Sequence, residues 1–217
     1  MSQFDFKPFY ERHLPHYQPP GATLFLSFRL ADSIPRPVLF ELQAEADRVD
    51  RLLATISDPE ERNQQALAEK ERLFYRWDDA LDGATSGPLW LQDPAVASLV
   101  VEALHHRHGQ VYDLEAFCIM PNHVHAVFTP LAKPDDTYHS LASIMHSLKL
   151  WTGRNANQLL RRQGGFWQHE NYDHVVRNEA ALMRIIRYVL NNPVKAGLVG
   201  LSELWPWSYC RELRSAL

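Results

Sequence analysis

Cysteine is scarce in this 217-residue chain, which contains only Cys118 and Cys210. Two thiols cannot build a disulfide framework or a four-cysteine zinc site, and Cys118 stands in an apolar segment where a buried, inert thiol is the ordinary interpretation. The chain also lacks any apolar run near the roughly 20 residues that cross a bilayer, and its first residues lack the charged and apolar regions of a secretory signal. We therefore expect a cytoplasmic protein with no membrane partner.

An overall positive charge is missing as well. The net charge is −4, which by itself argues against a nucleic-acid partner. The charges are unevenly distributed, however, because residues 148–217 hold ten Lys/Arg against five Asp/Glu. This asymmetry indicates a basic face in the last third of the chain, although solvated helices of differing composition explain the charges equally well.

The pattern of apolar residues predicts an α+β protein with an antiparallel sheet. Strands are expected over 22–30, 115–119, 124–128 and 173–177. Helices are expected over 94–108, 139–160 and 179–191, the last beginning after Asn178 and stopping before Pro193. An acidic stretch at 37–83 has helical spacing and a cap at Asp58, which predicts a helical hairpin inserted after the first strand.

Two histidines stand two residues apart just after a Pro-Asn turn, in the segment 120–125, which reads MPNHVH. Apolar runs on both sides of the turn predict a β-hairpin. Because strand side chains alternate, His123 and His125 share one face while Val124, Ala126 and Phe128 share the other and can enter a core. Two convergent imidazoles are a geometry for one metal ion. On this spacing alone, two ordinary strand histidines remain the more frequent case.

The helix predicted over 179–191 carries a tyrosine away from its apolar side. Its apolar stripe consists of Leu182, Ile185, Ile186 and Val189. At about 100° per residue, Tyr188 lies well off the centre of that stripe, and Asn192 follows it by one turn. Spacing alone favours a surface tyrosine and a polar helix end, so this pair indicates a site only together with other evidence.

Residues 120–125, together with YVLNNPVKAGL at 188–198, resemble the single-tyrosine HUH transposases, closest to the branch associated with repetitive extragenic palindromes. The likeness runs along most of the chain, with further similar segments at 13–17, 147–149, 166–168, 172–174 and 205–208. The acidic stretch 37–83 has no counterpart and is interpreted as an insertion. The resemblance implies one domain over 1–217 with a ferredoxin-like (RRM-like) antiparallel sheet and packed helices.

The resemblance also implies a chemistry. In that family the two motif histidines bind a divalent metal, a role that falls on His123 and His125, and a polar residue one turn after the tyrosine adds a ligand, here Asn192. Tyr188 would then attack a phosphodiester of single-stranded or hairpin DNA, giving a 5′-phosphotyrosine and a free 3′-hydroxyl for strand transfer in DNA transposition. Mixed nitrogen and oxygen ligation suits Mg²⁺ or Mn²⁺ rather than a closed tetrahedral zinc site.

Three alternatives stay open. Tyr172 is a rival nucleophile, disfavoured because it precedes a predicted strand and Val176, one turn later, is not polar. The chain could be a non-catalytic hairpin DNA-binding protein derived from a transposase, or a structural protein whose histidines only pack. Monomer and homodimer are equally open. The candidate phosphate contacts are basic residues near the proposed site: Arg177, Arg184, Arg187 and Lys195.

Overall fold

The chain divides into two compact units. The sheet unit comprises Met1–Ala31 and Leu89–Leu217, and the helical unit comprises Asp32–Pro88. The computed structural model of the protein describes the ranges 9–11, 15–17, 19–83 and 87–211. Within the motif segments, residues 13 and 14 lie outside the described residues. In the described ranges, no helix has the length and apolar character needed to cross a bilayer.

The sheet unit is built on a five-stranded antiparallel sheet with strand order β6-β3-β5-β4-β7. Its strands are β3 (Leu24–Arg29), β4 (Tyr112–Ile119), β5 (His123–Pro130), β6 (Tyr172–Val175) and β7 (Ser208–Cys210). A separate two-stranded sheet consists of β1 (Phe9–Glu11) and β2 (Pro15–Tyr17). The α+β antiparallel class is thus confirmed. The three-residue strands β1, β2 and β7 were not predicted, because such short segments carry too little alternation to be recognised.

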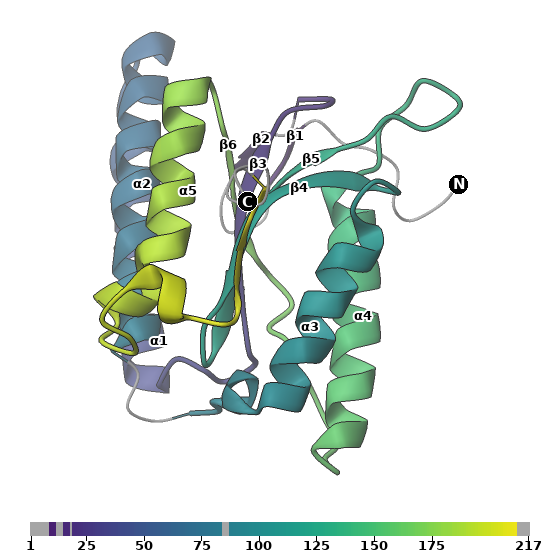
Figure 1. The fold of residues 1–217 in the computed structure, drawn as a ribbon. Helices are drawn as coiled ribbons and strands as arrows, with labels where there is room; N and C mark the ends of the chain where they lie inside the picture. The colour runs from purple at the N-terminus through teal and green to yellow at the C-terminus, as the bar shows by residue number, and fades with distance from the viewer. Residues whose placement is uncertain (1–8, 12–14, 18, 84–86, 212–217) are drawn as a thin grey trace. The chain divides into compact units, whose positions relative to one another are not determined.

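Helices cover both faces of this sheet (Figure 1). The helices of this unit are η1 (Trp90–Gln92), α3 (Pro94–Arg107), α4 (Leu141–Leu159), α5 (Glu179–Lys195) and η2 (Ser202–Leu204), and the three long ones lie on the sheet. Figure 1 shows α3 and α4 side by side on one face and α5 on the other. The order β3-α3-β4-β5-α4-β6, with β3 and β5 central, is compatible with the ferredoxin-like arrangement.

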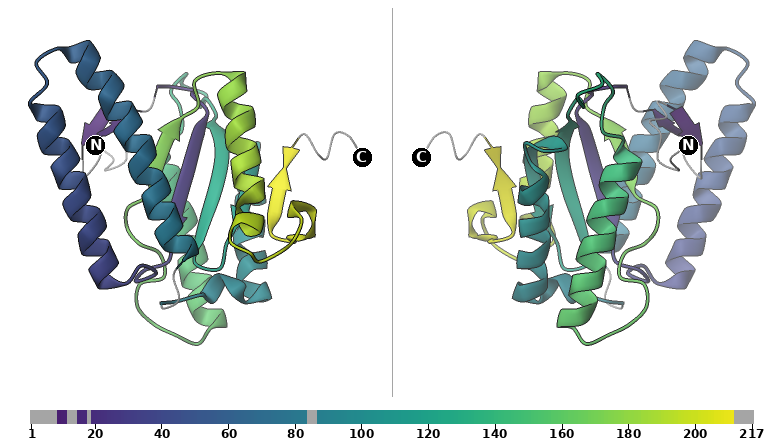
Figure 2. Two further views of the ribbon diagram at one scale, coloured as in Figure 1. Left: turned by 90° about the vertical axis from the view of Figure 1, so that its left-hand side faces the viewer. Right: turned by 90° about the vertical axis from the view of Figure 1, so that its right-hand side faces the viewer.

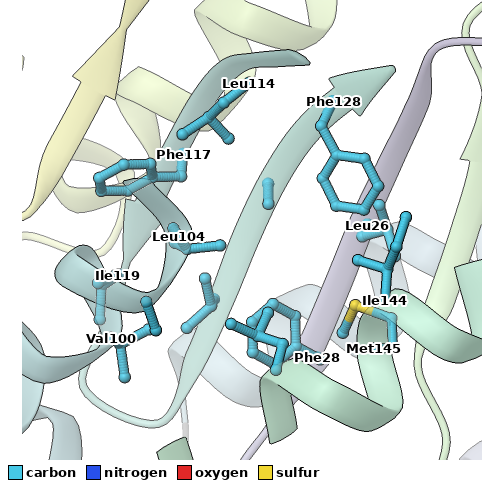
Figure 3. Close-up of a cluster of buried hydrophobic side chains, with 14 of the residues drawn as sticks. Leu26, Phe28, Val100, Leu104, Leu114, Phe117, Ile119, Phe128, Ile144 and Met145 are labelled. Carbon is cyan, nitrogen blue, oxygen red and sulfur yellow. The ribbon is translucent and has the colours of Figure 1, made fainter. Parts of the chain in front are cut away.

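The apolar core lies between the sheet and the pair α3 and α4 (Figure 3). The predicted alternation is confirmed, since Val124, Ala126 and Phe128 of β5 are all buried in it. β3 contributes its even-numbered residues to the same face, and the helices contribute an apolar stripe each. The members from β3, the residue after it and the helices include Leu24, Leu26, Phe28, Leu30, Val96, Val100, Leu104, Ile144, Met145 and Leu148.

α5 runs through Pro193 to Lys195, so the predicted stop before the proline is wrong. Proline removes one N–H donor from a helix. Here it stands only two residues before the end of α5, and its ring is buried. Two hydrogen bonds close the C-terminal end of α5. The Leu198 N–H donates to the Pro193 carbonyl at 2.9 Å, and the Gly197 N–H donates to the Val194 carbonyl at 3.0 Å. Gly197 adopts a φ of +70°, which is the left-handed conformation this ending requires.

The helical unit contains two helices, α1 (Arg36–Ala54) and α2 (Pro59–Asp82), which pack on each other (Figure 2). The expected cap is present, since the Asp58 carboxylate accepts hydrogen bonds from the N–H groups of the first turn of α2. A small apolar cluster holds the pair together, formed by Ile34, Leu42 and Leu81 with Val38, Leu39, Trp77 and Ala80. The helical hairpin predicted within 37–83 is therefore present.

Candidate functional site

The candidate site lies on the face of the sheet that α5 covers. β5 pairs with β3 on one side and with β4 on the other, so His125 stands opposite Ser27 and Cys118. Side chains directly opposite in an antiparallel pair share a face. His123 and His125 thus point away from the apolar core, as predicted, and both are fully buried.

The Nε2 atoms of the two imidazoles face each other. His123 Nε2 lies 3.0 Å from His125 Nε2, and the ring planes cross at 76°. At this separation both Nε2 atoms lie within reach of a single divalent ion, which binds imidazole nitrogens at about 2.1 Å.

Asn122 forms a hydrogen bond with the first histidine. Its side chain is 3 % exposed, and its Oδ1 lies 2.7 Å from His123 Nδ1. An amide oxygen only accepts, so the hydrogen of this bond belongs to His123 Nδ1. Nε2 of His123 then carries the lone pair that a metal needs. Sequence reasoning used Asn122 only as a turn residue; its position directly before His123 was the available signal.

Tyr188 is the residue of α5 that reaches the histidines. Its half-buried ring lies with its centroid 5.7 Å from that of His125. Phe25 of β3 supports this contact, because it stacks on His125 at 5.6 Å and meets the edge of Tyr188 at 6.1 Å. Phe25 was not foreseen as part of the site; its signal was its place on the strand face opposite the core residues of β3.

Asn192 follows Tyr188 by one turn of α5 and is 1 % exposed. Both polar atoms of its amide lack a hydrogen-bond partner within the described part of the chain. A buried amide without partners costs on the order of 1–3 kcal/mol, so it calls for an explanation. A ligand that takes the amide oxygen would supply one. An amide oxygen can serve as a ligand of a divalent ion.

Tyr172 also lies near this cluster. It belongs to β6, where it stands opposite Ser27, and its ring centroid is 6.2 Å from that of Phe25. The structure therefore brings both candidate nucleophiles, Tyr172 and Tyr188, against the ring of Phe25. The ring of Tyr188 also contacts that of His125.

The four basic candidates are all exposed. Arg177, Arg184 and Arg187 form no ion pair with any residue that the structure describes. The Nζ of Lys195 lies 6.0 Å from the centroid of the Tyr188 ring. Lys195 is thus beside the tyrosine, whereas Arg177 precedes α5 and the other two arginines lie on its exposed side.

Comparison with known proteins agrees with the motifs. The chain is 29% identical over 103 residues to a putative REP-associated tyrosine transposase of Haemophilus influenzae, covering 45% of this chain and 58% of that protein. It is 27% identical over 105 residues to the REP-associated tyrosine transposase of Escherichia coli K12, covering 47% and 56%. The chain is similar to REP-associated tyrosine transposases. This confirms the resemblance that the motifs indicated.

A comparison of the structure with solved structures also finds a REP-associated tyrosine transposase. A solved structure of a REP-associated tyrosine transposase bound to a REP hairpin aligns with a TM-score of 0.50 and 17% identity, covering 92% of this chain and 80% of that one. At this identity the likeness concerns the fold. No family model matches the chain. The chain spans a little over half the length of the curated transposases that it matches.

Proposed function

We propose that this protein is a metal-dependent DNA strand transferase that acts on single-stranded or hairpin DNA through Tyr188. The observation that carries the proposal is the contact of the Tyr188 ring with His125, whose Nε2 faces that of His123. The proposed nucleophile and the two proposed metal ligands are thus supplied by an α-helix and a β-strand that contact each other. His123 and His125 would hold the metal, with Asn192 as the third ligand.

The chemistry follows from these residue types. A divalent ion bound there would supply positive charge that polarises a phosphate oxygen. The Tyr188 oxygen forms a bond to phosphorus while the bond from phosphorus to the 3′-oxygen breaks, leaving a 5′-phosphotyrosine and a 3′-hydroxyl. A phenol is neutral near pH 7, so it gives up its proton to water as the bond forms, and the departing 3′-oxygen takes up a proton from water to become the hydroxyl. The ammonium of Lys195 beside the ring favours the negative charge that develops on the phenol oxygen.

Hairpin DNA is the partner we propose. The support comes from relatives, because the solved structure that shares this fold is described as bound to a REP hairpin. The exposed arginines of α5, which lack ion-pair partners in the described ranges, add positive charge beside Tyr188. Nucleic-acid binding depends mainly on such contacts to phosphates.

The test is formation of a covalent adduct. Wild-type protein mixed with a labelled, hairpin-bearing single strand and Mn²⁺ should give a protein–DNA band that survives denaturing electrophoresis. Tyr188→Phe removes only the hydroxyl, so it should keep DNA affinity while the adduct disappears. Tyr172→Phe is the matched control and should leave the adduct largely intact.

Two results would contradict the proposal. Disappearance of the adduct in Tyr172→Phe with retention in Tyr188→Phe would move the nucleophile to β6. DNA binding without any adduct across many hairpins would favour the alternative of a non-catalytic hairpin-binding protein.

A further inference from the structure

We propose that Asn122 is a positioning residue that holds His123 in the one neutral tautomer able to bind a metal through Nε2. The proposal deepens the proposed function and rests on its metal site. A neutral imidazole has one N–H and one lone pair, and only the lone pair can coordinate. Which nitrogen carries the lone pair therefore depends on the partner of the other nitrogen.

The hydrogen bond at His123 decides this choice. Asn122 Oδ1 accepts from His123 Nδ1 at 2.7 Å, and both side chains are buried. The lone pair is left on Nε2, which faces His125. The 3.0 Å hydrogen bond between the two Nε2 atoms then has His125 as its donor. His123 thus already presents a lone pair on Nε2, whereas His125 can bind a metal through Nε2 only after its proton moves to Nδ1.

The backbone of the turn keeps the Asn122 side chain in place. The Asn122 carbonyl accepts from the Leu30 N–H at 2.8 Å, and the Pro121 carbonyl accepts from the Leu91 N–H at 3.2 Å. The turn is closed by the Met120 N–H, which donates to the His123 carbonyl at 2.9 Å. Three hydrogen bonds therefore fix the backbone on either side of the amide. The side chain needs no movement to orient the ring.

Two substitutions distinguish the role of Asn122 as a hydrogen-bond acceptor from its role in packing. Asn122→Asp keeps an oxygen at the same place, whereas Asn122→Leu keeps the approximate size and removes the acceptor. Mn²⁺ binding, followed by electron paramagnetic resonance or calorimetry without DNA, should weaken about 10- to 100-fold in Asn122→Leu, as is typical when the partner of a ligating histidine is removed. Asn122→Asp should stay within a few-fold of wild type. Asn63→Leu, at an exposed asparagine of α2, is the matched control and should bind as wild type does.

A second measurement detects the tautomer directly. Nitrogen NMR of the metal-free wild type should show His123 protonated at Nδ1 and bare at Nε2. This spectrum decides the matter even if Asn122→Leu fails to fold, because a bare Nδ1 in the wild type would refute the proposal.

The remaining outcomes are distinct. Equal Mn²⁺ affinity in Asn122→Leu and wild type, or equal weakening in the Leu and Asp variants, would overturn the role of Asn122 while leaving the metal site standing. A wild type that binds no Mn²⁺ would instead remove the metal from the proposed function, and this inference with it.

Discussion

At the scale of single residues, two histidines of the same motif have different surroundings. His123 is held by the amide of Asn122, whereas His125 lies among the rings of Phe25 and Tyr188. His123 is therefore oriented by the amide of Asn122, whereas His125 has aromatic contacts in addition to its hydrogen bond with His123. In the proposed function the pair would bind one ion while His125 also contacts the proposed nucleophile.

The proposed metal site predicts a stabilisation by ligand binding. At about 100 times its dissociation constant, Mn²⁺ should add roughly 2.7 kcal/mol to the free energy of unfolding and raise the melting temperature by several degrees. His123→Ala combined with His125→Ala should abolish the shift, measured by thermal denaturation with and without Mn²⁺. His146→Ala, at an exposed histidine of α4, should leave it unchanged. An undiminished shift in the double variant would place the metal elsewhere.

At the scale of elements, residues one turn apart on α5 become progressively more buried along the helix. Residues four apart are rotated by about 40°, so the series Arg184, Tyr188, Asn192 turns from the exposed side into the interior. The three residues are exposed, half-buried and buried in that order. One helix can therefore offer positive charge, a nucleophile and a buried amide within about two turns.

The exposed side of α5 predicts a salt-dependent affinity for DNA. Arg184→Glu with Arg187→Glu should weaken binding to every sequence tested. The slope of log affinity against log salt should become shallower by about 0.7 for each phosphate of a single strand that the variant no longer neutralises. Arg51→Glu with Arg62→Glu, at two exposed arginines of the helical unit, is the control of equal charge change. If this control weakens binding as much, net charge rather than α5 is responsible.

At the scale of the whole molecule, the two faces of the five-stranded sheet hold different groups, the apolar core on one and the candidate site on the other. Its α3 and α4 face holds the main apolar cluster, and its α5 face holds the histidines, Phe25 and Tyr188. Alternation along each strand makes this division possible, because neighbouring residues of one strand serve different faces. That the sheet unit and the helical unit form one domain over 1–217 stays our proposal.

The core face predicts where stability resides. Phe128→Ala removes a fully buried ring and should cost about 3–5 kcal/mol of unfolding free energy. Leu150→Ala, at a leucine of α4 that is 63 % exposed, should change it by no more than about 0.5 kcal/mol. Denaturant titrations followed by tryptophan fluorescence and circular dichroism would measure both. Equal effects would show that this cluster does not dominate stability.

Local periodicity in the sequence was enough to predict most elements. The period of two placed His123 and His125 on one face of a strand and their apolar neighbours on the other, and this arrangement is present. The period of 3.6 located the long helices, and the caps Asp58 and Asn178 are found as expected. These features depend on residues close together in the chain, which is why one sequence suffices to predict them.

Only the tertiary structure determined which residues meet around the histidines. Strand pairing and helix packing bring Phe25 and Tyr188 to His125, and they also bring Tyr172 to Phe25. These contacts join residues far apart in the chain, and no local period encodes them. The end of α5 also depends on the tertiary structure. The helix continues through Pro193, which is buried and followed by hydrogen bonds that close the helix, although a proline judged by local sequence alone ends a helix.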